Sequence, residues 1–406
     1  MKQVLIAGEY LVMNIVDASC MGGLAQGGGW VRIAEEVAVT AIVTTPGTIS
    51  NLRMVLSAAP GAGKTWTFAV RKNGVDTALT VAITGTATTG SDTTNPVTVV
   101  AGDVVSFHAT PTSNPSNALA RWTTDFEGTN AGECLVLGNA GGYMSATEYG
   151  QVSSGMATTN ATETSVQQIV TAPGTLKNLY VKLSAAPGAG KSRTFTIRKN
   201  RVDTALAVTV SGTATTGSDT TNPVTVVAGD LLDIMLAFSG APAPICYVST
   251  GMTFVPTTDG EAPIMSGSAA YPTNSVATWV KLASGFGTVA WTSGNPASIQ
   301  RSGALTLYNL YVSLTVAPGA GKSRVFTVYN GTTATALTCT ISGTGTTGND
   351  TTHTAEVADG DTLTLVQTPS GTPANTFVRW GITSYIAVAG AKCYGLHPGA
   401  MAEMLS

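Results

Sequence analysis

Residues 58–103 read AAPGAGKTWTFAVRKNGVDTALTVAITGTATTGSDTTNPVTVVAGD, and residues 185–230 read AAPGAGKSRTFTIRKNRVDTALAVTVSGTATTGSDTTNPVTVVAGD. A third, more divergent copy begins at Val316 and reads VAPGAGKSRVFTVYNGTTATALTCTISGTGTTGNDTTHTAEVADGD. The equivalent lysines of the three copies are Lys64, Lys191 and Lys322. Their spacings, 127 residues (191 minus 64) and 131 residues (322 minus 191), are the size of a domain and not of a short stacking repeat.

The similarity extends beyond these segments and predicts where the units end. Upstream, residues 46–52 match residues 173–179. Downstream, Arg121-Trp122 matches Arg379-Trp380, and the second copy has Thr253-Phe254 near that place. The predicted organisation of the 406 residues is three tandem domains, 1–139, 140–262 and 263–390, followed by a C-terminal tail, 391–406.

Apolar residues alternate with polar ones through each copy, which is the periodicity of β-strands. In the first copy Trp66, Phe68 and Val70 alternate with smaller or polar residues, and the same holds from Leu79 to Ile83. We therefore predict an all-β fold in which the equivalent phenylalanines face inward: Phe68, Phe195 and Phe326. Cys339 occupies a position held by valine in the other copies, which predicts a core residue.

Turn signals separate these strands. Asn73-Gly74 and Asn330-Gly331 predict type I′ hairpins, because both central residues of such a turn need positive φ. Asn200-Arg201 predicts a strained turn or one of another type, and residues 89–95 and 216–222 are predicted to be loops. About eight strands in ~130 residues, without the Cys–Trp–Cys pattern of immunoglobulin domains, favour a jelly-roll-like β-sandwich.

The segment Gly-Ala-Gly-Lys-Ser/Thr resembles part of a phosphate-binding loop, but the match is incomplete. That motif requires a first glycine five residues before the second one. Ala58 stands at this position in the first copy, and a period-two segment follows instead of a helix. A helix N-terminus is what would hold the phosphate. We therefore expect a surface turn and no cofactor.

Candidate catalytic and metal-binding residues are few. His108, His353 and His397 do not recur at equivalent positions, and a lone histidine without a positioned partner does not make an acid–base site. An aspartate recurs in each Thr-rich segment, as Asp92, Asp219 and Asp350. One carboxylate among hydroxyls is more typical of an Asx turn than of a calcium site. We expect no catalytic, cofactor-binding or metal-binding residues.

Cysteines and charges exclude further classes of protein. The five cysteines, Cys20, Cys134, Cys246, Cys339 and Cys393, show neither zinc-ligand nor disulfide-framework spacing. Charged residues make up 11% of the chain against ~25% in an average protein, and the net charge of −3 argues against nucleic-acid binding. Arg71-Lys72 and Arg198-Lys199 are interpreted as solvated pairs at hairpin ends. No apolar segment predicts a membrane-spanning helix, and the N-terminus does not predict a signal peptide.

The repeat core resembles repeats in uncharacterised proteins of tailed bacteriophages and environmental viral sequences. The resemblance rests on PGAGKS, RKNG, DTAL and GTATTGSDTTN, and it covers ~80 residues of each unit. It implies a virion structural protein: a head decoration, a head fibre, or a tail fibre that binds a receptor. Relatives with one domain look like the jelly rolls of trimeric viral and tumour-necrosis-factor-like proteins, so three copies in one chain could form a pseudo-trimer.

These observations lead to one main functional hypothesis and two alternatives. The main hypothesis is a non-enzymatic phage virion protein on the particle exterior, assembled in the host cytoplasm. Its partners would be other virion proteins, further copies of itself or a host-surface glycan, and an apolar tail predicts an oligomer. The first alternative is a bacterial surface adhesin or extracellular filament subunit. The second is an enzyme with accessory carbohydrate-binding domains, although no segment is left over for a catalytic domain.

Overall fold

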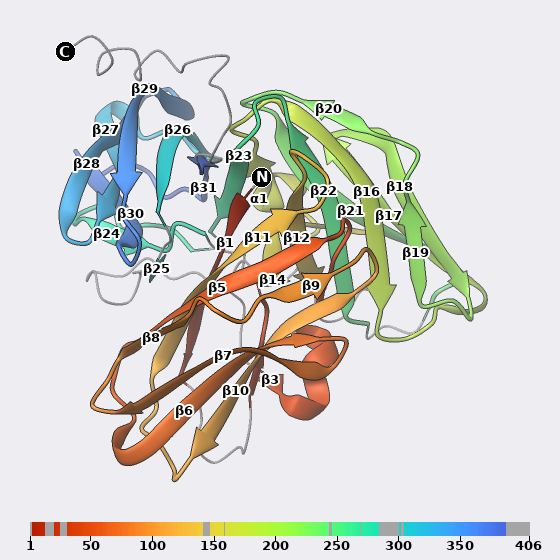
Figure 1. The fold of residues 1–406 in the computed structure, drawn as a ribbon. Coiled ribbons are helices and arrows are strands. Elements are labelled where there is room, and N and C mark those ends of the chain that lie inside the picture. Colours follow the sequence, from red (N-terminus) through yellow and green to blue (C-terminus); the bar gives the residue numbers. More distant parts are fainter. Residues whose placement is uncertain are drawn as a thin grey trace.

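The computed structural model describes residues 2–12, 20–24, 31–140, 147–157, 159–242, 246–268, 270–283, 300–301 and 304–386. Within these residues nearly all regular structure is strand, apart from the 3-10 helix η1 (Ile33–Ala38) and the single-turn helix α1 (Glu163–Val166). The predicted all-β class is confirmed. Three groups of strands, coloured red to orange, yellow to green and cyan to blue, lie around a common centre (Figure 1).

The first group of strands forms a pair of sheets that we call sandwich 1. Its strands are β1 (Lys2–Val12), β2 (Cys20–Gly22), β3 (Val31–Arg32), β4 (Ala41–Ile42), β5 (Gly47–Leu56), β6 (Gly61–Lys72), β7 (Val75–Gly85), β8 (Thr89–Asp92), β9 (Val97–Val99), β10 (Val104–Thr112) and β11 (Leu119–Gly128). One sheet has the order β1-β11-β5-β8, and β9 also pairs with β5. The other has the order β3-β2-β10-β6-β7, and β4 also pairs with β10.

Sandwich 2 repeats this arrangement. Its strands are β12 (Cys134–Ala140), β13 (Glu148–Gly150), β14 (Ser154–Ala157), β15 (Gln168–Ile169), β16 (Gly174–Leu183), β17 (Gly188–Lys199), β18 (Val202–Gly212), β19 (Thr216–Asp219), β20 (Val224–Val226), β21 (Leu231–Ser239) and β22 (Val248–Pro256). The sheets run β14-β12-β22-β16-β19 and β13-β21-β17-β18, with β20 paired to β16 and β15 paired to β21.

Sandwich 3 follows the same order once more. Its strands are β23 (Glu261–Gly267), β24 (Thr278–Val280), β25 (Gln300–Arg301), β26 (Leu305–Leu314), β27 (Gly319–Asn330), β28 (Thr333–Gly343), β29 (Thr347–Val357), β30 (Thr362–Ser370) and β31 (Val378–Tyr385). The sheets run β23-β31-β26-β29 and β24-β30-β27-β28, with β25 paired to β30. The shared strand order fits a jelly roll, in which strands distant in sequence are neighbours.

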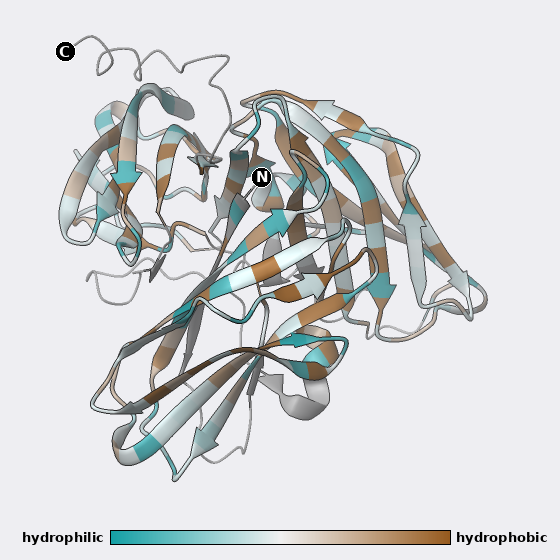
Figure 2. Ribbon diagram, viewed as in Figure 1, coloured by the Kyte–Doolittle hydropathy of each residue, from teal (hydrophilic) through white to brown (hydrophobic). Residues whose placement is uncertain are grey.

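Each sandwich encloses a hydrophobic core built from both of its sheets. In sandwich 1, Phe107 of β10 stacks on Trp122 of β11 with ring centroids 4.4 Å apart. The equivalent phenylalanines Phe68, Phe195 and Phe326 are all buried, so the predicted register is confirmed. Buried and exposed residues alternate along β7, and brown and teal bands alternate along strands such as β16 (Figure 2).

Strand pairing places the ends of the sandwiches slightly before the predicted boundaries. The predicted boundary at residue 139 falls inside β12, which pairs with β22 of sandwich 2. The boundary at 262 falls inside β23, which pairs with β31 of sandwich 3. Likewise β1 pairs with β11, so each unit begins with a strand that completes its own sheet. The pairing therefore favours boundaries in the turns that precede β12 and β23.

The pairing also corrects the alignment of the second copy. Ala120 lies opposite Leu56 in the first copy, and Val248 lies opposite the equivalent Leu183 in the second. The residues equivalent to Arg121-Trp122 are therefore Ser249-Thr250, not Thr253-Phe254. Sequence comparison failed here because neither residue type is retained in the second copy.

The hairpin turns differ among the three copies. Asn73 and Gly74 both have positive φ, which confirms the type I′ prediction. Asn200 and Arg201 adopt the same conformation, so the second turn is the strained one of the two predicted options, with Arg201 at φ 68°. The prediction for the third copy is wrong in position and in type. Asn330 ends β27, so the turn residues are Gly331 and Thr332, and of these two only Gly331 has positive φ.

The two segments that the sequence predicted as loops each begin with a strand. The first four residues of each segment predicted as a loop, 89–92 and 216–219, form the short strands β8 and β19. Sequence did not reveal them because they consist of Thr, Gly, Ser and Asp, which are typical of turns.

The C-terminal tail, 391–406, lies outside the described residues. The prediction that this tail makes an oligomer contact falls on the same residues.

Equivalent strands connect the three sandwiches in a cycle. β4 of sandwich 1 contacts β22 of sandwich 2, and β15 of sandwich 2 contacts β31 of sandwich 3. β25 of sandwich 3 contacts β11 of sandwich 1 and so completes the cycle. We call these three contacts seam 1–2, seam 2–3 and seam 3–1. Each seam joins the same two strand positions: a short strand, β4, β15 or β25, contacts the inner strand β22, β31 or β11 of another sandwich. Such a contact is heterologous, and here it closes on itself.

Candidate functional site

The Gly-Ala-Gly-Lys segment opens a long strand in every sandwich. In sandwich 1 it begins β6, with Gly61 at φ 106° and Gly63 at φ 70°, values that glycine adopts without strain. Lys64 follows and is half-buried, and β6 then pairs with both β7 and β10. The expected surface turn is wrong, because residues 61–64 belong to β6, where the register with β7 shifts between Gly61 and Thr65. The absence of nucleotide binding stays a prediction.

The recurring aspartates cap their own loops, as predicted. Asp219 accepts hydrogen bonds from the backbone N–H groups of Thr221 and Asn222, and a third from Ala207 on the neighbouring strand β18. Burial alone would raise the pKa of the Asp219 carboxyl, but a hydrogen bond from the Asn222 side chain and these three backbone bonds outweigh it and lower the pKa to about 2.

The sequence did not predict the hydrogen bond that Asp219 accepts from the N–H group of Ala207. β18 is the edge strand of its sheet, and Ala207 presents an N–H group outside the ladder that Asp219 satisfies. Asp92 and Asp350 bind Thr80 and Thr338 in the same way. An exposed strand edge is a template for pairing with another chain, so these carboxylates protect the edge as well as the loop.

The two histidines that the structure describes each contact one aspartate. His108 Nδ1 lies 2.8 Å from Asp76 Oδ2, and His353 Nδ1 lies 3.0 Å from Asp350 Oδ2. His353 replaces an asparagine that caps the same aspartate in the other copies, so its role is local to the loop. His397 lies outside the described residues. Within the described part of the chain, no three His, Cys, Asp or Glu side chains cluster as metal ligands.

The paired basic residues at the hairpin ends are not simply solvated, contrary to the prediction. Arg71 is mostly buried and forms ion pairs with Glu36, at 3.0 Å, and with Asp76, at 2.6 Å. Arg198 does the same with Glu163 and Asp203 in sandwich 2. The acidic partners lie 35 residues upstream and 5 residues downstream, a separation that the local sequence pattern did not reveal.

Three cysteines are free and buried: Cys134, Cys246 and Cys339. Burial raises the pKa of Cys339 to about 12 and that of Cys134 above its ordinary value. A thiol with a raised pKa is a poor nucleophile, which supports the interpretation of Cys339 as a core residue. The side chains of Cys20 and Cys393 lie outside the described residues.

The seams are where side chains from different sandwiches meet, and sequence alone did not single them out. At seam 1–2 Thr44 Oγ1 lies 2.8 Å from Thr253 Oγ1, and both side chains are buried. At seam 2–3 Thr383 Oγ1 lies 2.9 Å from Thr171 Oγ1. Thr44 and Thr171 are equivalent, two residues before the repeated Pro-Gly, so alignment of the repeats could have found them.

Glycine allows close backbone contact at the same two seams. A Cβ on Gly251 would lie 2.0 Å from the carbonyl oxygen of Ile42, and one on Gly381 would lie 2.6 Å from that of Ile169. Both glycines occupy the same strand position, one each on β22 and β31. The bare backbone of β22 and β31 is therefore part of the seam.

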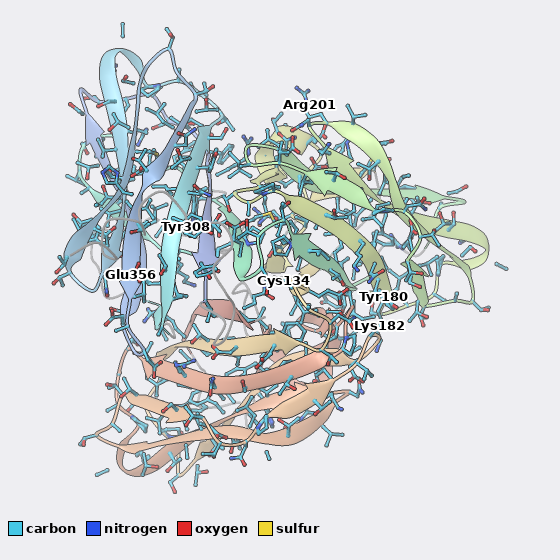
Figure 3. All side chains as sticks on the ribbon, turned by 45° about the horizontal axis from the view of Figure 1, so that its top comes forward. Cys134, Tyr180, Lys182, Arg201, Tyr308 and Glu356 are labelled. Atoms are coloured by element: carbon cyan, nitrogen blue, oxygen red, sulfur yellow. The ribbon has the colours of Figure 1, made fainter. Side chains whose placement is uncertain are left out.

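The first strands of the sandwiches lie near the common centre and also contact one another. The side-chain amide of Gln3 on β1 binds the N–H and C=O groups of Leu135 on β12, both at 2.8 Å. Cys134 of β12 lies 3.6 Å from the carbonyl oxygen of Glu261 at the start of β23. Figure 3 places Cys134 and Tyr308 toward the region where the sandwiches meet and Arg201 at an outer end of sandwich 2.

Glu133 joins side chains of two sandwiches beside this centre. Its carboxylate accepts a hydrogen bond from Thr45 of sandwich 1 and lies 2.7 Å from Lys177 Nζ of sandwich 2. Burial raises the pKa of Glu133, but the bonds from Lys177, Thr45 and Asn130 outweigh it and lower the pKa below its ordinary value. Glu261, at the equivalent position, instead accepts a hydrogen bond from the hydroxyl of Tyr308.

Comparison with known proteins adds no further assignment. No protein-family model matches the chain, and no curated protein matches it. Among the described residues no helix is long and apolar enough to cross a membrane. The site that the geometry singles out is therefore the set of three seams, which can hold the sandwiches together.

Proposed function

We propose that the protein is a non-enzymatic structural component on the exterior of a tailed-bacteriophage particle, in which one chain forms a pseudo-trimer. The observation that carries the proposal is the cycle of seams, in which the same two strand positions meet three times. A closed heterologous cycle is what three identical subunits form around a three-fold axis. Here the three units belong to one chain.

The buried hydroxyl pairs support a permanent role for the seams. Thr44, Thr171, Thr253 and Thr383 contribute no charge, so little desolvation energy opposes their burial. The close contacts at Gly251 and Gly381 leave no space for water between the backbones. A rigid block with few charges suits a shell or fibre component that is held by its neighbours.

The resemblance of the repeat to bacteriophage proteins supports the location in the virion. A head decoration, a head fibre or a tail fibre would each use the outward sheets of the sandwiches for contacts with partners. Within the described residues no three His, Cys, Asp or Glu side chains cluster as metal ligands.

Mass spectrometry of purified particles tests the proposal. Particles from a host that carries the gene are banded by density, and peptides from residues 58–103 and 316–361 are quantified against the major capsid protein. We expect the protein at a fixed ratio to the capsid protein, and we expect it to be removed by protease treatment of intact particles. Recovery only in the cell envelope or the culture medium would favour the adhesin or filament alternative and contradict the proposal.

A further inference from the structure

Sandwich 3 carries an exposed aromatic and aliphatic patch near one end of its β-sandwich. Tyr271 is 51% exposed, Val276 is 53% exposed and Val316 is 48% exposed. The ring of Tyr271 packs on that of the half-buried Phe377, with centroids 4.6 Å apart and a tilt of 40° between the planes. Tyr271 is the aromatic residue among the large hydrophobic side chains that are exposed in the described part of the chain.

Hydrogen bonds hold the parts of this patch together. Thr315 Oγ1 accepts a hydrogen bond from the N–H group of Phe377, and Thr376 Oγ1 accepts one from the N–H group of Val316, both at 3.0 Å. Thr273 Oγ1 donates to the carbonyl oxygen of Val276 at 2.6 Å. The aromatic pair and the two valines are therefore fixed relative to one another.

A buried arginine fixes the loop that carries Tyr271. Arg324 is fully buried and donates from Nη1 to the carbonyl oxygen of Thr273, at 3.0 Å, and from Nη2 to that of Ala374, at 2.9 Å. Trp66 holds the equivalent position in sandwich 1 and donates only to Ser116, the counterpart of Ala374. The guanidinium thus adds a second link, which ties the Tyr271 loop to the sandwich. Arg324 acts as a positioning residue.

The patch is specific to sandwich 3. The position of Phe377 is Leu119 in sandwich 1 and Tyr247 in sandwich 2. Tyr247 packs against Ala38 and Val39 of the preceding sandwich, so its ring belongs to a seam. The third repeat is also the most divergent one in sequence, and this patch gives part of that divergence a physical consequence.

We propose that the Tyr271–Phe377 pair is a binding site for an uncharged sugar residue of a glycan. An exposed ring offers an apolar face to the C–H groups of a pyranose, and the tyrosine hydroxyl adds a polar group at its edge. In the same loop Ser275 is exposed and Asn274 is half-buried, and they supply a hydroxyl and an amide group for sugar hydroxyls. Residues 270–280 carry no charge, so the site suits a neutral sugar.

This inference rests on the proposed function, because only an exterior protein meets a host-surface glycan. Its test uses the purified full-length protein and is independent of incorporation into particles. Saturation-transfer-difference NMR is recorded with the methyl glycosides of glucose, galactose, mannose and N-acetylglucosamine, each at millimolar concentration. We expect saturation transfer to the ring protons of at least one of the four.

Three variants decide whether the signal comes from this patch. Tyr271→Ala should weaken binding ~10-fold or more, whereas Tyr271→Phe keeps the ring and should retain most of it. Phe377→Leu, which installs the residue of sandwich 1, should reduce binding by removing the support of the ring. Val75→Ala alters a side chain that is 67% exposed in sandwich 1 and should change nothing.

Two outcomes would overturn the site. One is saturation transfer to none of the four glycosides, including the case in which light scattering instead shows Tyr271-dependent self-association, which would assign the patch to contact between copies. The other is transfer that survives in Tyr271→Ala at full strength. Detection of the protein in particles would leave the proposed function standing in both cases.

Discussion

Seams 1–2 and 2–3 join sandwiches that are consecutive in the chain, whereas seam 3–1 joins the first sandwich to the last. The two consecutive seams use paired threonines and a glycine against a carbonyl group. At seam 3–1 the glycine position is held by Thr123 and the threonine position by Asp125. Arg53 then pairs with Asp125, at 3.2 Å, and with Asp359 of sandwich 3, at 2.5 Å.

This difference shows how one chain can specify the order of its own units. Tyr180 and Tyr311 stand at the position of Arg53, and Ala101 and Ala228 stand at the position of Asp359. The charged pair therefore forms only between sandwiches 3 and 1. Complementary charges favour the correct partner more than they add affinity. The consecutive seams are already selected by the short connection between their sandwiches, which raises their effective concentration.

The largest expected effect tests whether the seams transmit instability. Phe195→Ala removes a buried ring from sandwich 2 and should destabilise it by ~3–5 kcal/mol. Hydrogen exchange followed by mass spectrometry should then show faster exchange in sandwich 2 and a smaller increase in both neighbours. The matched variants are Phe68→Ala and Phe326→Ala. If faster exchange stays confined to the mutated sandwich in all three variants, the seams contribute little to the stability of the neighbouring sandwiches.

A pH effect distinguishes seam 2–3 from the other two. Asp233 is fully buried where Ser106 and Thr364 stand in the other sandwiches. Burial, then the neighbouring Glu163, raises the pKa of the Asp233 carboxyl to about 8, although Gln167 and Arg198 oppose this. The charged groups that face it are Glu163 of α1, Arg198 of β17 and, across the seam, Arg379 of β31, whose pKa burial lowers to about 10.

The sign of this effect follows from the two states. The folded protein holds the Asp233 proton more tightly than the unfolded chain, where the pKa is the ordinary 3.8. Stability is therefore fully present below about pH 4 and is lost as the pH rises toward 8, by at most ~1.4 kcal/mol per pH unit. Chemical denaturation at several pH values should show this slope. Asp233→Ser, which installs the residue of sandwich 1, should abolish it; an unchanged slope would assign the effect to other groups.

A smaller effect is expected from filling the space at a glycine. Gly251→Thr places a side chain where a Cβ would lie 2.0 Å from the carbonyl oxygen of Ile42, and it should cost ~1–3 kcal/mol. The matched control is the reverse exchange at seam 3–1, Thr123→Gly, which should cost less because it creates no overlap. Thermal unfolding measures both. Equal costs would show that the consecutive seams are packed no more tightly than seam 3–1.

Much of each sandwich could be predicted from the sequence, because the signals are local. The inward set that contains Phe68 follows from a period of two, and the loop caps such as Asp92 follow from the chemistry of an Asx turn. The short strand β8 was missed because its composition is that of a turn. The third hairpin was misplaced by one residue because Asn330-Gly331 is a strong local signal that the strand register overrides.

The seams could not be predicted from local patterns. Thr44 and Thr253 are small polar residues separated by 209 positions, and nothing in their neighbourhoods shows that both are buried. Only the tertiary arrangement makes Gly251 a contact point, since a glycine in a strand has several explanations. The same applies to the Tyr271–Phe377 patch, whose two rings come from loops about 100 residues apart (377 minus 271).

The smallest effect is expected from the pair that sets the order of the units. Asp359 is 58% exposed, so the Arg53–Asp359 pair is partly solvated and should contribute ~0.2–1 kcal/mol, less at high salt. Asp359→Ala, which installs the residue of the other two turns, should therefore leave thermal unfolding nearly unchanged. The variant should instead close seam 3–1 less often. Small-angle scattering and cross-linking between sandwiches 3 and 1 should show a larger fraction of molecules with this seam open, and the fraction should be larger still at high salt. Ala101→Asp, at the equivalent turn of sandwich 1, faces Tyr180 instead of an arginine and should not tighten seam 1–2. If Asp359→Ala closes as completely as the natural chain at every salt concentration, the ion pair does not specify the order of the units, and the difference between the seams is one of packing alone.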